Sequence, residues 1–260
     1  MRYGLIGKNI QYSKSPTIHE FMAKKLNIDL RYDLFDIEES DIPHLFKHLR
    51  NYVFKGFNVT IPFKQIVMKH VDVLTSKAKR IKAVNTIYIK DGKIVGDNTD
   101  YDGFLGLLKM SKINVENQRI FILGTGGAAK AAYVVLTDLG ADVTVVTRNT
   151  NNIDPMFQKV ITYSKLSSDQ VDIYVQATPI GTYPKVTESV LNQSLVAGKT
   201  VIELIYNPPI TQMMKYASKS YGGANMLILQ ALRSEEIWFN QKISINNQLI
   251  EELKEVIYSE

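Results

Sequence analysis

Hydrophobic and polar positions follow two alternating periods along the first part of the chain. Apolar runs with strand-like spacing occupy residues 1–7, 30–38 and 56–62, and apolar positions at helical spacing occupy 15–28 and 40–51. Ser15 is the expected N-cap of the first helix, with Pro16 as its first helical residue. This part is therefore predicted to alternate strands with helices.

A hairpin and a bridging helix are predicted next. The hairpin spans residues 85–98, because Asp91-Gly92 suits a tight primed turn. Thr99 is expected to cap a helix over 99–112, since Phe104 and its apolar neighbours recur at helical spacing. We interpret this helix as the bridge between two domains.

The second half is predicted to alternate strands with helices. A strand, a glycine-rich turn, a helix and a second strand are predicted over residues 117–149, and further strands over 172–179 and 200–208. The last two are nearly continuous in apolar residues, which is typical of a parallel sheet covered on both faces. The alternation predicts an α/β, doubly wound fold, followed by two helices from Asn225 onward.

Composition narrows the class of protein. Of the 260 residues, 45% are hydrophobic and 22% are charged, as in ordinary globular proteins. The chain has no cysteine, which excludes a disulfide framework and a thiol nucleophile and fits a reducing compartment. Neither a signal peptide nor an apolar run of membrane-spanning length is visible. We expect a cytoplasmic protein without membrane partners.

The charge balance does not predict a nucleic-acid partner. The net charge is +5, and the densest basic run is KAKRIK at residues 77–82. A nucleic-acid site would need a larger basic stripe with aromatic residues between its charges, so a solvated helix face is favoured. A positive field would still help to capture an anionic substrate or a phosphate-bearing cofactor.

Polar side chains gather at the end of one predicted strand, in GFNVTIPFK at residues 56–64. Asn58 and Thr60 share one face because successive side chains of a strand point to opposite sides. Pro62 ends the strand, since it cannot donate to a ladder, and Lys64 follows directly. This tip is either a polar binding site or an edge strand with one solvated face.

A cofactor motif follows the apolar strand at residues 120–123. The sequence GTGGAA matches a dinucleotide-binding turn, in which Gly124 makes the turn, Gly126 admits a pyrophosphate and Ala129 packs against the sheet. The helix N-terminus would offer free N–H groups to the phosphates. Because strand, turn, helix and second strand are all present, nucleotide binding is favoured over a plain tight turn.

The end of the second strand indicates which dinucleotide binds. An NAD site usually carries an acid there, whereas this chain has Arg148 and no acid, and Asp142 lies at the opposite end. A guanidinium matches the planar oxyanion of a 2′-phosphate. NADP(H) is therefore favoured over NAD(H), the alternative being an exposed loop arginine.

A nicotinamide cofactor implies hydride transfer, which needs a proton donor or acceptor at the substrate oxygen. The four histidines (His19, His44, His48 and His70) lie in helix-like segments without polar company and are expected on the surface. Lys64 and Asp100 are better candidates, because each ends a strand-like segment among polar residues. No cluster with metal-ligand spacing is visible, so no metal is expected.

Seven motifs, taken in order, resemble the shikimate dehydrogenase family from residue 4 to about residue 240. They are YSKSPTIHE, GFNVTIPFK, AVNTI, GDNTDYDGF, LGTGGAAKA, ATPIGT and IYNPPIT. The resemblance implies reversible, NADPH-dependent reduction of 3-dehydroshikimate to shikimate, a step of aromatic amino-acid biosynthesis. It also implies an α/β fold with a substrate-binding catalytic domain (1–102 and 233–260) and an NADP-binding Rossmann domain (103–232). The C-terminal helices would return to the first domain, and the protein would be a monomer or homodimer.

The resemblance assigns roles to individual residues. Lys64 would be catalytic and paired with Asp100. The substrate-binding residues would be Ser13 and Ser15, which hold the carboxylate, with Asn58, Thr60, Asn85, Tyr206 and Gln230, the last two from the cofactor domain. The cofactor-binding residues would be Gly124, Thr125, Gly126, Gly127, Ala128, Thr147, Arg148, Asn149, Thr178 and Ile205.

The departures from the family pattern lie on the cofactor side. They are the order Thr147-Arg148-Asn149, Gln176, Thr182, Glu203 and a short loop before Met226. Two other readings follow: a quinate/shikimate dehydrogenase that also accepts NAD, and a catalytically silent NADP-binding sensor. Arg148 argues against the first, and intact Lys64 and Asp100 argue against the second.

Overall fold

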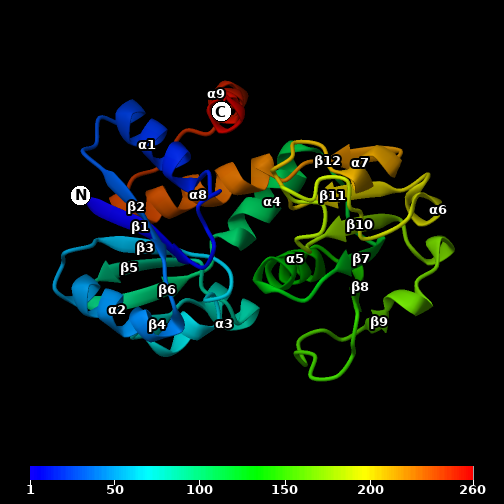
Figure 1. The fold of residues 1–260 in the computed structure, drawn as a ribbon, viewed down its shortest axis with the longest axis horizontal. Coiled ribbons are helices and arrows are strands. Elements are labelled where there is room, and N and C mark those ends of the chain that lie inside the picture. Colours follow the sequence, from blue (N-terminus) through cyan, green and yellow to red (C-terminus); the bar gives the residue numbers. More distant parts are fainter. Residues whose placement is uncertain (260) are drawn as a thin grey trace. The chain divides into compact units, whose positions relative to one another are not determined.

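The computed structural model describes residues 1–259, which divide into two compact units (Figure 1). One unit comprises Met1–Gly103 together with the chain from Ile228 onward, and the other comprises Phe104–Leu227. Across residues 1–259 we find no helix with the length and apolar character needed to cross a bilayer.

The first unit is built on a mixed sheet of six strands. The strands are β1 (Arg2–Gly7), β2 (Arg31–Asp36), β3 (Gly56–Val59), β4 (Val73–Leu74), β5 (Thr86–Lys90) and β6 (Lys93–Asp97), in the order β2-β1-β3-β5-β6-β4. β5 runs antiparallel to β3 and β6, and the other pairs are parallel. The predicted β5–β6 hairpin is confirmed, with positive φ at Asp91 and Gly92 as a primed turn requires.

Helices cover both faces of this sheet. The helices of this unit are α1 (Ser15–Lys25), α2 (Ile42–Arg50), α3 (Ser76–Ile81), α9 (Asn247–Tyr258) and the part of α8 (Ala224–Phe239) from Ile228 onward, with the short 3₁₀ turns η1 (Glu39–Asp41) and η2 (Ile66–Lys69). α4 (Asp100–Met110) begins in this unit, and its residues from Phe104 onward belong to the other unit. α2 packs Leu45 and Phe46 on one face, and on the other Trp238 of α8 stacks on Tyr3 with ring centroids 4.5 Å apart. α9 packs on α1, so the predicted return of the C-terminal helices is confirmed.

The second unit contains a sheet in which all six strands are parallel (Figure 1). The strands are β7 (Arg119–Leu123), β8 (Asp142–Thr147), β9 (Val160–Thr162), β10 (Ile173–Gln176), β11 (Thr200–Glu203) and β12 (Lys219–Tyr221). The helices are α5 (Gly127–Asp138), α6 (Gln193–Val196) and α7 (Gln212–Tyr216), with η3 (Tyr163–Lys165) and η4 (Ser168–Gln170).

The strand order β12-β11-β10-β7-β8-β9 is that of the doubly wound dinucleotide-binding fold. The order reverses between β7 and β10, and ligands of such sheets bind outside the carboxyl ends of the strands at this point. The predicted Rossmann-like architecture is confirmed. β4, β9 and β12 were not predicted, because two or three residues are too few to show a period.

Candidate active site

Lys64 and Asp100 form an ion pair in the first unit. Lys64 lies in the turn after β3, held by a backbone hydrogen bond from Val84 N to Lys64 O (2.7 Å), and Asp100 is the first residue of α4. Lys64 Nζ donates to Asp100 Oδ2 at 2.6 Å, and only 14% and 8% of the two side chains are exposed. The pair fixes an ammonium where it can donate to an oxygen of a bound molecule.

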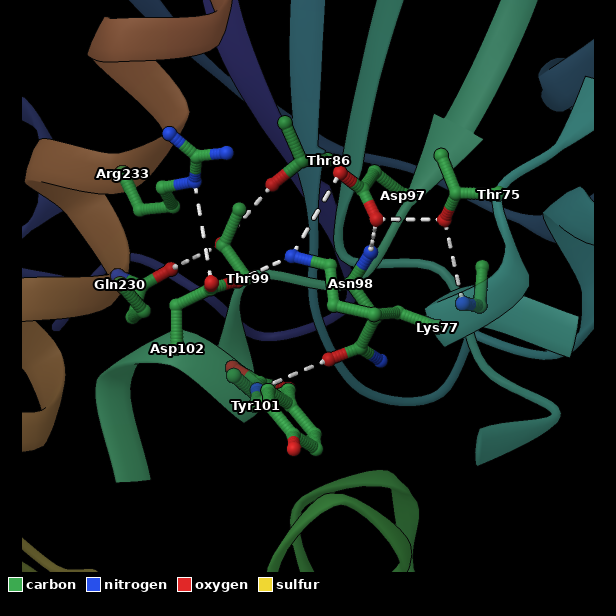
Figure 2. A network of polar contacts seen from close by, with 12 residues as sticks. Thr75, Lys77, Thr86, Asp97, Asn98, Thr99, Tyr101, Asp102, Gln230 and Arg233 are labelled. Carbon is green, nitrogen blue, oxygen red and sulfur yellow. Dashed lines mark hydrogen bonds and ion pairs between the residues drawn. The ribbon is translucent and has the colours of Figure 1, made fainter. Parts of the chain in front are cut away.

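The Asn85 amide links Asp100 to Thr99 and Gln230. Asn85 Nδ2 donates to Asp100 Oδ1 at 2.9 Å, and Thr99 N donates to Asn85 Oδ1 at 2.7 Å. Gln230 points at Thr99 from α8 (Figure 2), and its Oε1 lies 3.4 Å from Asn85 Nδ2. Gln230 was predicted in the cofactor domain, but α8 is one unbroken helix whose part from Ile228 onward belongs to the first unit.

Ion pairs and hydrogen bonds of charged side chains connect β6, α3, α4 and α8 near this site (Figure 2). Asp97 accepts from the Thr75 hydroxyl at 2.6 Å, and Lys77 forms ion pairs with Asp97 and Asp102. Arg233 Nε of α8 lies 3.8 Å from Asp102 Oδ1. Lys77 is therefore not part of a solvated face, whereas Lys79, Arg80 and Lys82 of the KAKRIK run are exposed. The sequence signal for this cluster was the spacing of acids in GDNTDYD.

The two serines lie at the start of α1, but the predicted cap is wrong. The helix begins at Ser15, and Lys14 is the N-cap. Ser13 Oγ accepts from Ser15 N at 3.2 Å, and the Ser15 hydroxyl bonds to the Tyr32 phenol. Thr60, past the end of β3, makes no hydrogen bond through its hydroxyl to any of residues 1–259. The Thr60 hydroxyl is thus available to a bound molecule.

Asn58 and His19 are buried together, which corrects the expectation that every histidine lies on the surface. His19 is 0% exposed and Asn58 is 5% exposed. Asn58 Oδ1 lies 3.1 Å from His19 Nε2 and accepts from the Tyr32 hydroxyl at 2.8 Å. His19 Nδ1 lies 2.7 Å from Glu235 of α8, a partner 216 positions along the chain that no local pattern reveals.

The other three histidines differ from His19. His44 is exposed, and His48 and His70 are partly exposed. Within residues 1–259, no group of three or more His, Cys, Asp and Glu side chains is arranged to hold a metal ion.

The two glycines Gly124 and Gly126 of the turn after β7 have different backbone requirements. Gly124 has φ +114°, and a Cβ there would lie 3.0 Å from the Ala177 carbonyl oxygen. Gly126, the N-cap of the 12-residue helix α5, has φ −72°, and a Cβ there would meet no protein atom within 4 Å. The fold requires glycine at 124 but not at 126, where open space over free N–H groups suits a phosphate.

The residues after β8 carry no free acid. Thr147 ends the strand and donates to Asn149 O at 3.2 Å, while Arg148 and Asn149 are exposed. The first acid beyond them, Asp154, accepts from the buried Lys130 of α5 at 2.8 Å. The end of β8 therefore presents the Arg148 guanidinium, while Asp154 is paired with Lys130.

The residues that depart from the family pattern anchor the loops after β10 and β11. Gln176 Oε1 accepts from Thr178 N at 2.8 Å. Glu203 accepts from Ile205 N at 3.1 Å and from the Thr211 hydroxyl at 2.8 Å. Burial raises the pKa of the Glu203 carboxyl to about 7.

Two further contacts complete these loops. The Thr182 hydroxyl donates to Asn207 O at 3.0 Å, and Gly223 N of the short loop donates to Ile205 O at 3.1 Å. The departures thus act on the backbone that carries Thr178, Ile205 and the partly exposed Tyr206.

Comparisons with known proteins agree with this geometry. Residues 5–87 match the family model described as "Shikimate dehydrogenase substrate binding domain". The curated protein "Shikimate dehydrogenase (NADP(+))" of Clostridium beijerinckii is 38% identical over 99% of this chain and 98% of its own length.

Two solved structures have the same fold over nearly the whole chain. A chorismate mutase/shikimate 5-dehydrogenase fusion protein from Clostridium acetobutylicum superposes with a TM-score of 0.91 and 38% identity, covering 99% of this chain and 97% of that one. Shikimate 5-dehydrogenase from Thermus thermophilus, in complex with NADP(H) and shikimate, gives a TM-score of 0.88 and 26% identity, with 99% of both chains covered.

Proposed function

The chain belongs to the shikimate dehydrogenase family, and from that premise we propose that it reduces 3-dehydroshikimate reversibly to shikimate with NADPH. The observation that carries the proposal is the ion pair of Lys64 and Asp100, at 2.6 Å and nearly buried, beside the polar end of β3. As an NADP-dependent oxidoreductase of aromatic amino-acid biosynthesis, the protein needs a substrate site and a dinucleotide site.

We propose that each unit supplies one of these sites. The first unit, with the segment 5–87 that matches a substrate-binding domain, binds the ring acid. The second unit, with its doubly wound parallel sheet, binds NADP(H). The functional boundaries proposed from the sequence, 1–102 with 233–260 and 103–232, lie close to the two compact units.

Lys64 is the proposed acid–base group. Bound NADPH supplies the hydride, and negative charge develops on the substrate carbonyl oxygen as its carbon is reduced. The Lys64 ammonium stabilises this charge and donates a proton to the oxygen, and in the reverse direction it takes the proton back. Asp100 fixes the ammonium in place through the 2.6 Å hydrogen bond and accepts from a neighbouring ring hydroxyl.

The remaining polar groups are proposed to orient the ring. Ser13 and Ser15 hold the carboxylate at the start of α1, and the uncommitted hydroxyl of Thr60 donates to the substrate. Asn85 and Gln230 meet ring hydroxyls, since Asn85 donates to Asp100 and Gln230 lies beside Asn85. We propose Tyr206 as a further substrate ligand. Asn58 was predicted to contact the substrate, and its buried amide is engaged by protein partners on both sides.

The second unit fits the cofactor. The turn residues Gly124, Thr125, Gly126, Gly127 and Ala128 would hold the pyrophosphate at the N-terminus of α5. Thr147, Arg148 and Asn149 would hold the 2′-phosphate, and Thr178 and Ile205 would contact the nicotinamide end. The open space at Gly126 and the absence of a free acid after β8 support this assignment.

One assay tests the function. The protein is mixed with shikimate and NADP, and the absorbance of the reduced cofactor is followed, with parallel reactions containing NAD or quinate. We expect turnover with shikimate and NADP. If no reduced cofactor forms with either dinucleotide, the proposed activity is wrong, and efficient turnover of quinate with NAD would favour the broader enzyme.

We also propose that the protein works in the cytoplasm as a monomer or homodimer. The support is a chain without cysteine, as suits a reducing compartment. Light scattering coupled to size-exclusion chromatography gives the assembly state directly.

A further inference from the structure

His19 of α1 and Glu235 of α8 form a buried pair of titratable groups that the proposed reaction does not use. Both side chains are 0% exposed, and His19 Nδ1 lies 2.7 Å from Glu235 Oε1. The imidazole stacks on Tyr32 with ring centroids 4.4 Å apart. Burying two such groups costs desolvation free energy, which only hydrogen bonds and pairing inside the protein can offset.

The amide of Asn58 defines which nitrogen of His19 carries a proton. Asn58 Nδ2 lies 3.3 Å from the backbone oxygen of Asn85, which can only accept, so this side of the amide is the NH₂ group. The opposite atom, Oδ1, must then accept from both the Tyr32 hydroxyl and His19 Nε2. His19 therefore carries a proton on Nε2.

One further proton lies between His19 Nδ1 and Glu235 Oε1. It resides either on the ring, giving an imidazolium and a carboxylate, or on the carboxyl group, giving two neutral partners. The second oxygen of Glu235, Oε2, is buried without a hydrogen-bond partner among residues 1–259. An ionised carboxylate with a bare buried oxygen is the more expensive form.

The surroundings of the pair favour the same form. Burial raises the pKa of the Glu235 carboxyl, and the hydrogen bond to His19 offsets this only in part. Tyr32 of β2 is a further titratable group in contact with the pair, and it also resists ionisation because burial raises its pKa well above the usual value. No lysine or arginine forms an ion pair with Glu235 in the described part of the chain.

Hydrogen bonds connect this pair to the proposed catalytic residues. Asn58 Nδ2 donates to Ser234 Oγ at 3.0 Å, and Ser234, Thr86 and Thr99 bond to one another at 2.9–3.1 Å. Figure 2 shows two members of this cluster, Thr86 and Thr99, which point toward each other. Thr99 in turn orients Asn85, whose amide holds Asp100. The Asn58 amide thus links His19 of α1 to the hydrogen bonds around Asp100.

We propose that His19 and Glu235, the latter as a neutral carboxylic acid, are positioning residues that orient the Asn58 amide and through it Asn85 and Asp100. The O–H of Glu235 donates a hydrogen bond to His19 Nδ1, which keeps the single N–H proton of the neutral ring on Nε2, where it points at Asn58. This inference rests on the proposed function only for its kinetic consequence, because the protonation state can be measured without turnover.

The first experiment is nitrogen-15 NMR of the full chain labelled in histidine, with the other three histidines assigned from their Gln variants. We expect His19 to show one protonated and one unprotonated nitrogen, and to keep this pattern in Glu235→Gln, whose amide can donate to Nδ1. Two protonated nitrogens would mean an ion pair and would overturn the assignment of a neutral acid.

The second experiment compares kinetics with shikimate and NADP. Glu235→Leu removes the donor at similar volume, and we expect kcat to fall about ten- to a hundredfold, as small displacements of catalytic groups do, with KM for NADP unchanged. Glu235→Gln should recover most of that loss. The exposed control Glu251→Gln should behave like the unaltered protein.

The outcomes separate the two proposals. Absence of turnover in the unaltered protein would reject the proposed function, while the NMR result would stand by itself. Equal losses in Glu235→Gln and Glu235→Leu, or none in either, would reject the positioning role. If Glu235→Leu does not fold, Tyr32→Phe removes the other donor to Asn58 Oδ1, and a kcat equal to that of the unaltered protein would then reject it.

Discussion

Each unit buries a carboxylate near its proposed ligand site, and the two carboxylates are treated differently. Asp100 in the first unit receives the Lys64 ammonium at 2.6 Å and the Asn85 amide at 2.9 Å. Glu203 in the second unit receives one backbone N–H and one hydroxyl, and no cation pairs with it within residues 1–259. Asp100 therefore fixes the position of the Lys64 ammonium, whereas Glu203 anchors the loop after β11.

The same contrast extends to the surroundings. Around Asp100 the proposed ligands are side chains, braced by further side chains on α3, α4 and α8 (Figure 2). Around the glycine turn the proposed ligands are backbone N–H groups, and what matters is the open space at Gly126 and the positive φ at Gly124, which excludes a side chain. Substitutions in the first unit should therefore change rate, and those in the second should change cofactor affinity or stability.

Lys64→Ala is expected to have the largest effect. Removing the ammonium should lower kcat by ~10²–10⁴, the usual contribution of a positioned acid–base group, with little change in KM for shikimate. In a double variant with Asp100→Asn the losses should be less than additive, because the two residues act as one unit. Steady-state kinetics checks this, with the exposed Lys69→Ala as control. A near-normal kcat in Lys64→Ala would show that Lys64 is not the acid–base group.

Glu203 predicts how stability depends on pH. Its pKa is raised from 4.5 to about 7, so as pH rises through this window the unfolded chain releases the proton first. The free energy of unfolding should then fall by about 3 kcal/mol between the two values and stay level above the upper one.

Glu203→Gln removes this titration. Urea unfolding at pH 5 and pH 8 should show that the variant loses less stability between the two pH values than the unaltered protein does. The exposed Glu188→Gln should keep the original dependence. The same slope in all three proteins would show that Glu203 ionises normally.

Arg148→Ala tests the choice of cofactor. Charge-assisted hydrogen bonds are worth about 1.5–3 kcal/mol, so NADPH should bind roughly ten- to a hundredfold more weakly. NADH lacks the 2′-phosphate and should bind almost as before. Cofactor fluorescence titrations give both affinities, and equal losses would show that Arg148 does not contact the 2′-phosphate.

Gly126→Val is expected to have the smallest effect. The side chain enters space that no protein atom occupies, so thermal stability should fall only by the small amount that a poorer N-cap costs, while NADPH should bind about tenfold more weakly, which is about 1.4 kcal/mol. Gly124→Ala is the matched control and should lower stability by about 1–3 kcal/mol, because its φ and the Ala177 oxygen exclude a side chain. Unchanged NADPH affinity in Gly126→Val would place the pyrophosphate elsewhere.

Local chemistry in the sequence determined much of the fold. The Asp91-Gly92 turn, the apolar strands of the second sheet and the helix after the glycine turn were all predictable, because each depends on residues close in sequence. The identities of Lys64 and Asp100 as candidates came from polar residues at strand ends, and their role in catalysis stays a prediction. The family followed from seven ordered motifs.

Tertiary structure decided the rest. His19 looked like a surface residue because its partners, Asn58 and Glu235, come from β3 and α8. Ser15 looked like a cap because it precedes Pro16, but the helix begins one residue earlier, at Ser15, with Lys14 as its N-cap. Burial and long-range hydrogen bonds depend on which elements the core brings together, and a one-dimensional pattern does not contain that information.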